Sequence, residues 1–146
     1  MSTIANDFIE LRVPSKPEYV AIVRTLVTDL AHRIALSASA IEDVQVAVSE
    51  ACANVVCHAY AGSKAHAAEI VVRCSTENGY LVMEVEDQGQ GFDESSRPRV
   101  RRSRRNGGFG LILMRNLMDN VTMDSSPNHG TVIRMVKGNS RRRSRL

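Results

Sequence analysis

The chain has 146 residues, of which 43% are hydrophobic and 24% are charged, and its formal net charge is +3. These values are typical of a single globular domain that can bury a core without disulfide or metal cross-links. No apolar run is long enough to span a bilayer, and residues 1–7 lack the features of a secretory signal, so we expect a cytoplasmic protein.

The charge is distributed unevenly along the chain. Residues 94–105 carry six arginines against one glutamate, and residues 137–146 carry one lysine and four arginines, so each segment is +5 and the remainder is −7. An acidic body with two basic segments differs from a uniformly basic nucleic-acid binder. The basic tail also lacks the aromatic residues on which bases stack, so we expect no specific nucleic-acid partner.

The cysteines, Cys52, Cys57 and Cys74, are odd in number and form no C-x-x-C pair. This argues against a disulfide framework and against a zinc site. We expect buried or half-buried thiols, because a nucleophilic cysteine beside His58 would lack a third orienting group.

The first predicted elements are a strand and a helix. Residues 8–13 alternate in hydrophobicity, which is typical of a strand with one buried face. Ser15-x-x-Glu18 has the spacing of a helix capping box, and Pro17 suits a first turn, so a helix should begin there. Its apolar stripe comprises Val20, Val23, Leu26, Val27, Leu30 and Ile34.

Ser39-x-x-Glu42 repeats the capping signal and predicts a second helix. Its apolar stripe comprises Ile41, Val44, Val48, Ala51 and Val55. Glu50, Asn54 and His58 are spaced by four, so they should stack on one edge of this helix beside the stripe. The trio can be an ordinary solvated helix face or a row of functional groups.

Two strands are predicted over residues 69–74 and 80–86, joined at Asn78-Gly79, the dipeptide preferred by a type I′ hairpin turn. Residues 61–68 are expected to form a loop. Residues 93–106 contain six arginines and no apolar periodicity, which predicts a mobile loop.

The C-terminal part predicts a helix over residues 111–119 and a strand pair over residues 121–123 and 131–136, with a turn at residues 128–130. Residues 138–146 should be a disordered tail. This order of elements predicts an α+β fold, a two-layer sandwich with helices on one face of a mixed, mostly antiparallel sheet.

Two glycine motifs flank the arginine-rich segment. Asp87-x-Gly89-x-Gly91 follows directly on a predicted strand, and residues 107–111 read Gly-Gly-Phe-Gly-Leu. Glycines at alternate positions allow the backbone to approach a ligand closely. Taken alone, the first motif is equally consistent with a surface turn, but three polar or glycine motifs on regular elements favour a ligand site.

The order of elements, with Glu50-x-x-x-Asn54, Asp87-x-Gly-x-Gly91 and Gly108-x-Gly110 in these places, resembles the GHKL ATPase superfamily of gyrase, histidine kinases and MutL. Within it, the chain looks most like the anti-sigma factor serine kinases of the RsbW and SpoIIAB type. The resemblance runs from about residue 8 to residue 137. It implies the Bergerat ATP-binding fold, with a single kinase domain over residues 1–137 and a basic tail over residues 138–146.

The resemblance also implies roles for individual residues. Asn54 would hold Mg²⁺ through its side-chain oxygen, and Glu50 would be the general base for an attacking serine hydroxyl. Asp87 would accept a hydrogen bond from the adenine amino group, supported by Thr131. Gly89 and Gly91 would let the chain pass close to the base and ribose.

Residues 97–110 would form the lid over ATP. Arg105 and Arg104 are the best candidates to clamp the γ-phosphate, since phosphoryl transfer depends on stabilising its charge. Gly108 and Gly110 would place backbone N–H groups at a helix start, a ready anion site. The remaining members of the implied nucleotide-binding set are His58 and Leu111.

The resemblance implies an ATP- and Mg²⁺-dependent protein serine/threonine kinase that phosphorylates a STAS-type anti-anti-sigma protein and binds a sigma factor. It also implies a homodimer, with no membrane partner. Two alternatives are an RsbT-like ATP-binding switch that activates a phosphatase, and a detached histidine-kinase catalytic domain.

Overall fold

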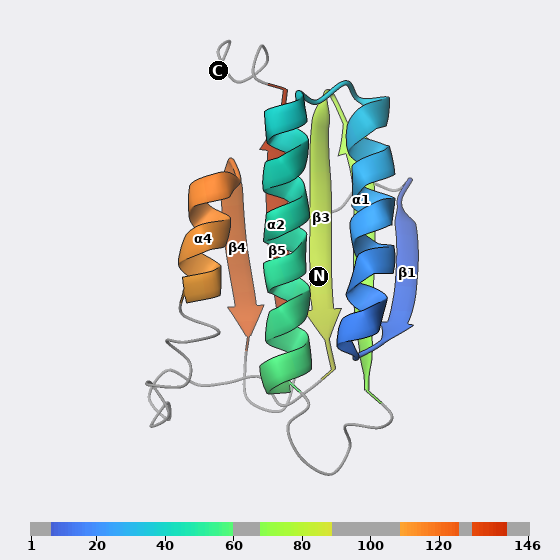
Figure 1. The fold of residues 1–146 in the computed structure, drawn as a ribbon, viewed down its shortest axis with the longest axis vertical. Coiled ribbons are helices and arrows are strands. Elements are labelled where there is room, and N and C mark those ends of the chain that lie inside the picture. Colours follow the sequence, from blue (N-terminus) through green and yellow to red (C-terminus); the bar gives the residue numbers. More distant parts are fainter. Residues whose placement is uncertain (1–6, 60–67, 89–108, 126–129, 140–146) are drawn as a thin grey trace.

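The computed structural model describes residues 7–59, 68–88, 109–125 and 130–139, which build one five-stranded sheet with its helices on one face (Figure 1). The strands lie in the order β1-β2-β3-β5-β4, and all four neighbouring pairs are antiparallel. Their bounds are Ile9–Pro14, Glu69–Glu77, Tyr80–Asp87, Thr131–Gly138 and Asn120–Ser125 in that order. The predicted two-layer α+β fold is confirmed.

The second layer contains three α-helices in the described part of the chain. They are α1 (Val20–Arg33), α2 (Ala38–Asn54) and α4 (Phe109–Leu117), and α2 packs between the other two (Figure 1). A 3₁₀ turn, η1 (Pro17–Tyr19), precedes α1, and a π-helical turn, η2 (Val55–Ala59), follows α2. None of the described helices is long and apolar enough to cross a membrane.

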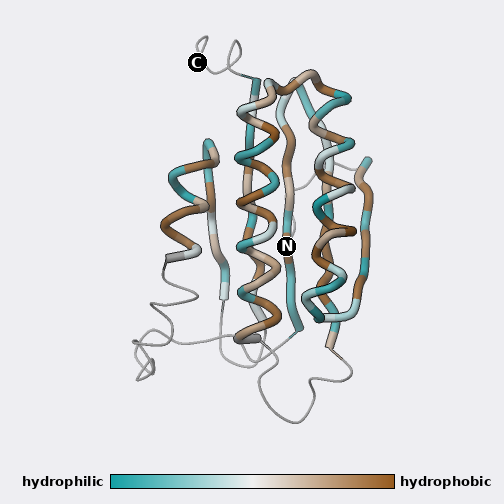
Figure 2. The backbone as a smooth tube through the Cα atoms, in the orientation of Figure 1, coloured by the Kyte–Doolittle hydropathy of each residue, from teal (hydrophilic) through white to brown (hydrophobic). Residues whose placement is uncertain are grey.

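The core lies between the two layers. Hydrophobic and hydrophilic residues alternate along α1 and α2, and the buried positions recur every three or four residues (Figure 2). They face the buried side chains of the central strands, which include Ile70, Val72, Leu81, Met83 and Met135. Burying one such side chain contributes about 1.5–3 kcal/mol to stability. The contact between the layers therefore determines which face of each helix is buried and how the strands are registered.

The predicted capping box at Ser15 is wrong. The Ser15 backbone N–H donates to the Ala68 carbonyl and so extends the pairing of β1 with β2, while its hydroxyl is buried without a hydrogen bond among the described residues. The chain then makes η1 before α1 begins at Val20, and Lys16 precedes η1 without a side-chain cap. The proline does lie in the first turn, as expected.

The cap of α2 is Ser37, two residues before the predicted Ser39. Ser37 is extended, and its hydroxyl accepts a hydrogen bond from the Ala40 N–H at 3.1 Å. The shift follows from how α1 ends. Ala35 adopts a left-handed conformation with φ of 58°, and the Leu36 N–H donates to the Ala31 carbonyl, which places the next serine at the start of α2.

The hairpin between β2 and β3 is confirmed. Asn78 and Gly79 have φ of 54° and 83°, as a type I′ turn requires, and Glu77 pairs with Tyr80 across it.

The C-terminal elements differ slightly from their predicted bounds. The helix begins two residues earlier, at Phe109, and ends at Leu117. The predicted tail begins too early, because Gly138 is the last residue of β5 and its N–H donates to Asp119. The predicted loops over residues 61–67 and 93–106, and the tail from residue 140, lie outside the described residues.

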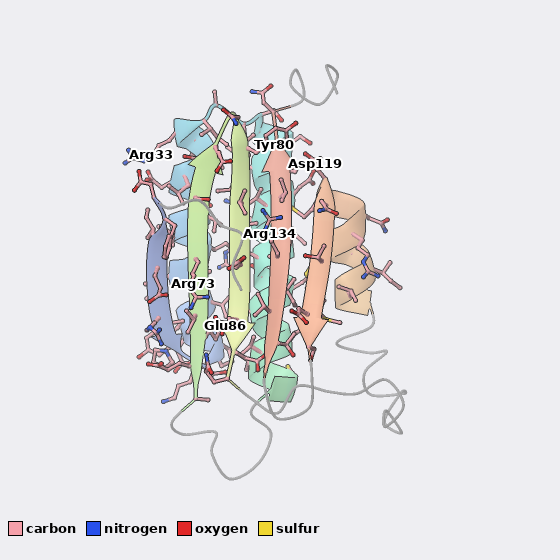
Figure 3. The ribbon with its side chains drawn as sticks, turned by 180° about the vertical axis from the view of Figure 1, so that it is seen from behind. Arg33, Arg73, Tyr80, Glu86, Asp119 and Arg134 are labelled. Carbon is pink, nitrogen blue, oxygen red and sulfur yellow. The ribbon has the colours of Figure 1, made fainter. Side chains whose placement is uncertain are left out.

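The sheet face opposite the helices carries a cross-strand row of alternating charges. Glu10, Arg73, Glu84 and Arg134 are paired in register on β1, β2, β3 and β5. Figure 3 shows Arg73 beside Glu86, with which it forms an ion pair, and Arg73 also pairs with Glu10 at 2.9 Å. Opposite charges in adjacent strands favour this register, because a one-residue slip would move them to the other face.

The Ser37 cap can be tested by substitution. Ser37→Ala should lower the free energy of unfolding by about 1 kcal/mol, because the Ala40 N–H loses its acceptor. Urea denaturation monitored by circular dichroism would measure it. Ser39→Ala is the matched control and should change stability by less than about 0.5 kcal/mol. A larger loss for Ser39→Ala than for Ser37→Ala would contradict the assignment.

Candidate functional site

The ends of five elements meet at one end of the molecule. The helix α2 and the strands β3 and β4 end there, and α4 and β5 begin there (Figure 1). The reason is topological, because α2 and β3 run toward this end and α4 and β5 run away from it. Glu50 with Asn54, Asp87, and Gly110, the described residues of the three predicted motifs, therefore lie toward the same end of the molecule.

Glu50 and Asn54 lie one turn apart on α2, and both are partly buried. Gly110, in the first turn of α4, packs directly against them. A Cβ atom at position 110 would lie 2.9 Å from Glu50 Oε1 and 3.6 Å from Asn54 Oδ1. A side chain at position 110 would push the Glu50 carboxylate aside, whereas glycine leaves both the carboxylate and the amide in place.

Asp87 is the last residue of β3 and is only 4% exposed. Its side chain is on the helix-facing side of the sheet, because it continues the alternation of Leu81, Met83 and Val85. Gly130, with φ of 80°, is so close that a Cβ atom there would lie 2.2 Å from the Asp87 carbonyl oxygen and 3.4 Å from Asp87 Oδ1. A glycine is required here for both conformation and space.

Thr131 pairs with Asp87 across β5 and β3, as the predicted supporting role requires. The structure adds Ser125, which the sequence analysis missed. Ser125 pairs with Thr131 from β4, and their hydroxyl oxygens lie 2.7 Å apart. This hydrogen bond fixes the Thr131 hydroxyl, so Asp87, Thr131 and Ser125 form one polar row across three strands. Ser125 lies two residues beyond the strand predicted over residues 121–123, so no local signal indicated it.

His58 does not continue α2. It lies in the π-helical turn η2, where hydrogen bonds span five residues, so the four-residue spacing from Asn54 no longer predicts a shared edge. The His58 side chain lies outside the described part of the structure. Such π turns occur often at functional sites, and η2 contacts β3, the strand that ends at Asp87.

Leu111 is partly buried and packs against the core beside Gly110. The other predicted site residues lie outside the described residues. They are Gly89, Gly91, Arg104, Arg105 and Gly108.

The cysteines differ in exposure. Burial raises the pKa of the Cys52 and Cys74 thiols to about 12, with the neighbouring Cys74 contributing at Cys52, so both are neutral and inert at physiological pH. The expectation of buried or half-buried thiols is wrong for Cys57, which is exposed in η2. Among the described residues, no three His, Cys, Asp or Glu side chains gather to hold a metal ion by themselves.

Residues 13–137 match the model of the histidine kinase-like ATPase domain family. Several curated relatives are named serine-protein kinase RsbW. The one from Bacillus pumilus is 38% identical, covering 94% of this chain and 89% of the relative. The one from Bacillus subtilis is 36% identical, covering 90% and 85%. The one from Listeria innocua is 37% identical, covering 81% and 80%.

Solved structures share the fold. The RsbU and RsbW domains of Rv1364c from Mycobacterium tuberculosis align with a TM-score of 0.64 and 20% identity, over 89% of this chain and 32% of that chain. A histidine kinase domain from Erythrobacter litoralis aligns with a TM-score of 0.59 and 18% identity, over 90% and 64%.

The family match spans the elements that bring Glu50, Asn54, Asp87 and Gly110 to one end of the molecule, and the curated relatives match over most of their own length. The chain therefore belongs to the histidine kinase-like ATPase family and, within it, to the RsbW serine-protein kinases.

Proposed function

We propose that the protein uses ATP and Mg²⁺ to phosphorylate a serine or threonine of a STAS-type anti-anti-sigma protein, and that it binds a sigma factor. The observation that carries this proposal is the contact of Gly110 with Glu50 and Asn54, at the end of the molecule where Asp87 also lies. The RsbW relatives support the same activity. Sigma factors act on RNA polymerase, so the proposed site of action is the cytoplasm.

The phosphates of ATP would lie at the start of α4. The Asn54 amide oxygen and the Glu50 carboxylate next to Gly110 are hard oxygen donors, which fit Mg²⁺ and its preference for oxygen ligands. When bound, Mg²⁺ would neutralise charge on the phosphates. Asn54 would hold the ion, and the N–H groups in the first turn of α4, which have no partner within the helix, would donate to phosphate oxygens.

Glu50 would accept the proton of the attacking hydroxyl. A general base must first be within reach of that proton, and Glu50 lies one turn before Asn54 with Oε1 directed toward the α4 N-terminus. The carboxylate therefore adjoins the place where the γ-phosphate would sit. It would favour a hydroxyl acceptor, which must lose a proton as it attacks.

The adenine would lie at Asp87. Its carboxylate can accept a hydrogen bond from the adenine amino group, whereas guanine offers a carbonyl at that position. Gly130 limits the space around the carboxylate, and Thr131, oriented by Ser125, is placed to support it directly or through water. The buried row of Asp87, Thr131 and Ser125 would therefore select adenine over guanine.

The other predicted contacts remain proposals. Arg104 and Arg105 would clamp the γ-phosphate from the lid, Gly108 would extend the anion site, and Gly89 and Gly91 would pass close to the base and ribose. His58 would complete the set from η2. The family resemblance further motivates a homodimer.

The role of Glu50 can be tested by phosphoryl transfer. Glu50→Ala should lower the rate of transfer from radiolabelled ATP to candidate STAS-type proteins by about 10²–10⁴-fold, because the hydroxyl loses its base. Glu42→Ala, an exposed glutamate on the same helix, should transfer at the wild-type rate. Undiminished transfer by Glu50→Ala would reject the role, and an acid-labile product would indicate a histidine acceptor instead.

The role of Asp87 can be tested by calorimetry. Asp87→Asn should abolish measurable ATP binding, because the amide keeps one acceptor oxygen for two donors, the adenine amino group and the Thr131 hydroxyl, and its NH2 group would oppose one of them. Glu86→Gln is the matched control on the same strand. Its side chain pairs with Arg73 on the opposite face, so it should lose some stability and keep ATP affinity. Unchanged ATP affinity in Asp87→Asn would exclude the adenine assignment.

A further inference from the structure

Lys137 is a buried cation that the proposed site does not use. It lies near the end of β5 and is 5% exposed, on the helix-facing side of the sheet with Ile133 and Met135. Burying an ammonium group is strongly unfavourable unless it is paired and hydrogen-bonded. The role of Lys137 therefore depends on the groups that pair with its ammonium.

Among the described residues, the two hydrogen-bond partners of Lys137 belong to helices. Its Nζ donates to Asp43 Oδ2 in α2 at 3.1 Å, and it also donates to the carbonyl of Leu117, the last residue of α4. A cation at a helix C-terminus is favourable, because the last carbonyls lack partners within the helix. One side chain thus joins the sheet, α2 and the end of α4.

Backbone contacts support the same end of α4. The Asp119 N–H donates to the Val136 carbonyl at 2.9 Å, and the Gly138 N–H donates to Asp119 Oδ2 at 2.7 Å. The C-terminus of α4 is therefore tied to β5 on both sides of Lys137.

The other end of α4 is the end that packs on Glu50 and Asn54 through Gly110. Nine residues of helix measure about 13 Å, so a tilt of about 5° at Leu117 would move Gly110 by about 1 Å. A displacement of this size in a site that positions reacting groups can lower the rate by about 100-fold. A change in the orientation of α4 at Leu117 would therefore displace the end of the helix that adjoins the proposed phosphate site.

We propose that Lys137 is a positioning residue for the kinase reaction. By holding the Leu117 carbonyl against Asp43, it sets the angle of α4 and so keeps the Gly110 end of the helix on Glu50 and Asn54. This inference rests on the proposed binding of ATP at that end. Lys137 does not contact the nucleotide. It acts through the C-terminal end of α4, away from the proposed phosphate site.

The double variant Lys137→Met/Asp43→Leu separates positioning from stability. Lys137 is the buried member of this ion pair and Asp43 is partly exposed, so replacing both by apolar residues leaves no unpaired charge and the unfolding midpoint should be close to the wild-type value. The Leu117 carbonyl still loses its donor, so the dissociation constant for ATP·Mg²⁺ by calorimetry should rise at least about tenfold.

The single variant Lys137→Met provides a second measurement, because it leaves Asp43 unpaired as well. It should be less stable than the double variant and show the same loss of ATP affinity. Arg134→Met is the matched control, since Arg134 lies on β5 but on the opposite face, where it pairs with Glu84. It should bind ATP as the wild type does.

Wild-type ATP affinity in the double variant would overturn the inference about Lys137 and leave the proposed function intact. A loss of ATP affinity in Lys137→Met that is restored by adding Asp43→Leu would do the same. Failure of the wild-type protein to bind ATP would instead overturn the proposed function. A raised dissociation constant in both Lys137 variants, with normal affinity in Arg134→Met, is the expected result.

Discussion

The approach of Gly110 to the Glu50 carboxylate is the contact on which the arrangement of the site depends. It brings the start of α4 against the edge of α2 that carries Glu50 and Asn54, and a Cβ atom at that position would lie 2.9 Å from Glu50 Oε1. The sheet, the core and the anchored end of α4 all serve to keep this contact in place. Glycine has no Cβ atom that would displace this carboxylate, which accounts for a glycine in the first turn of α4.

A second glycine performs the equivalent task at the other half of the site. Gly130 closes on Asp87 in a conformation with positive φ, and the row formed by Asp87, Thr131 and Ser125 crosses three strands. The carboxylate is buried where strand pairing, rather than a loop, determines its position. The helix edge and the strand row thus present two different kinds of polar group at one end of the fold.

Much of this fold was accessible from local patterns. The apolar stripes of α1 and α2 and the Asn78-Gly79 turn depend on short-range periodicity and backbone sterics, and the structure confirms them. The helix starts were less predictable. Ser15 and Ser39 have the capping spacing, but β-pairing to Ala68 and the left-handed Ala35 decide where the helices begin.

The site was predictable to a similar degree. Spacing placed Glu50 and Asn54 on one helix edge, and the glycine motifs indicated close contacts. The role of Ser125, the π turn at His58 and the buried Lys137 were not predictable, because each depends on tertiary neighbours that are distant in sequence.

Whether the three segments share one nucleotide can be measured by nuclear magnetic resonance of the protein titrated with ATP and with Mn²⁺ in place of Mg²⁺. If three distant segments share one nucleotide, the paramagnetic ion should broaden the amide signals of Asn54 and Gly110 most strongly. Asp87 should then shift on nucleotide binding with less broadening, because it contacts the base. Strongest broadening at the opposite end of the molecule, near Ala35 and Asn139, would contradict the account.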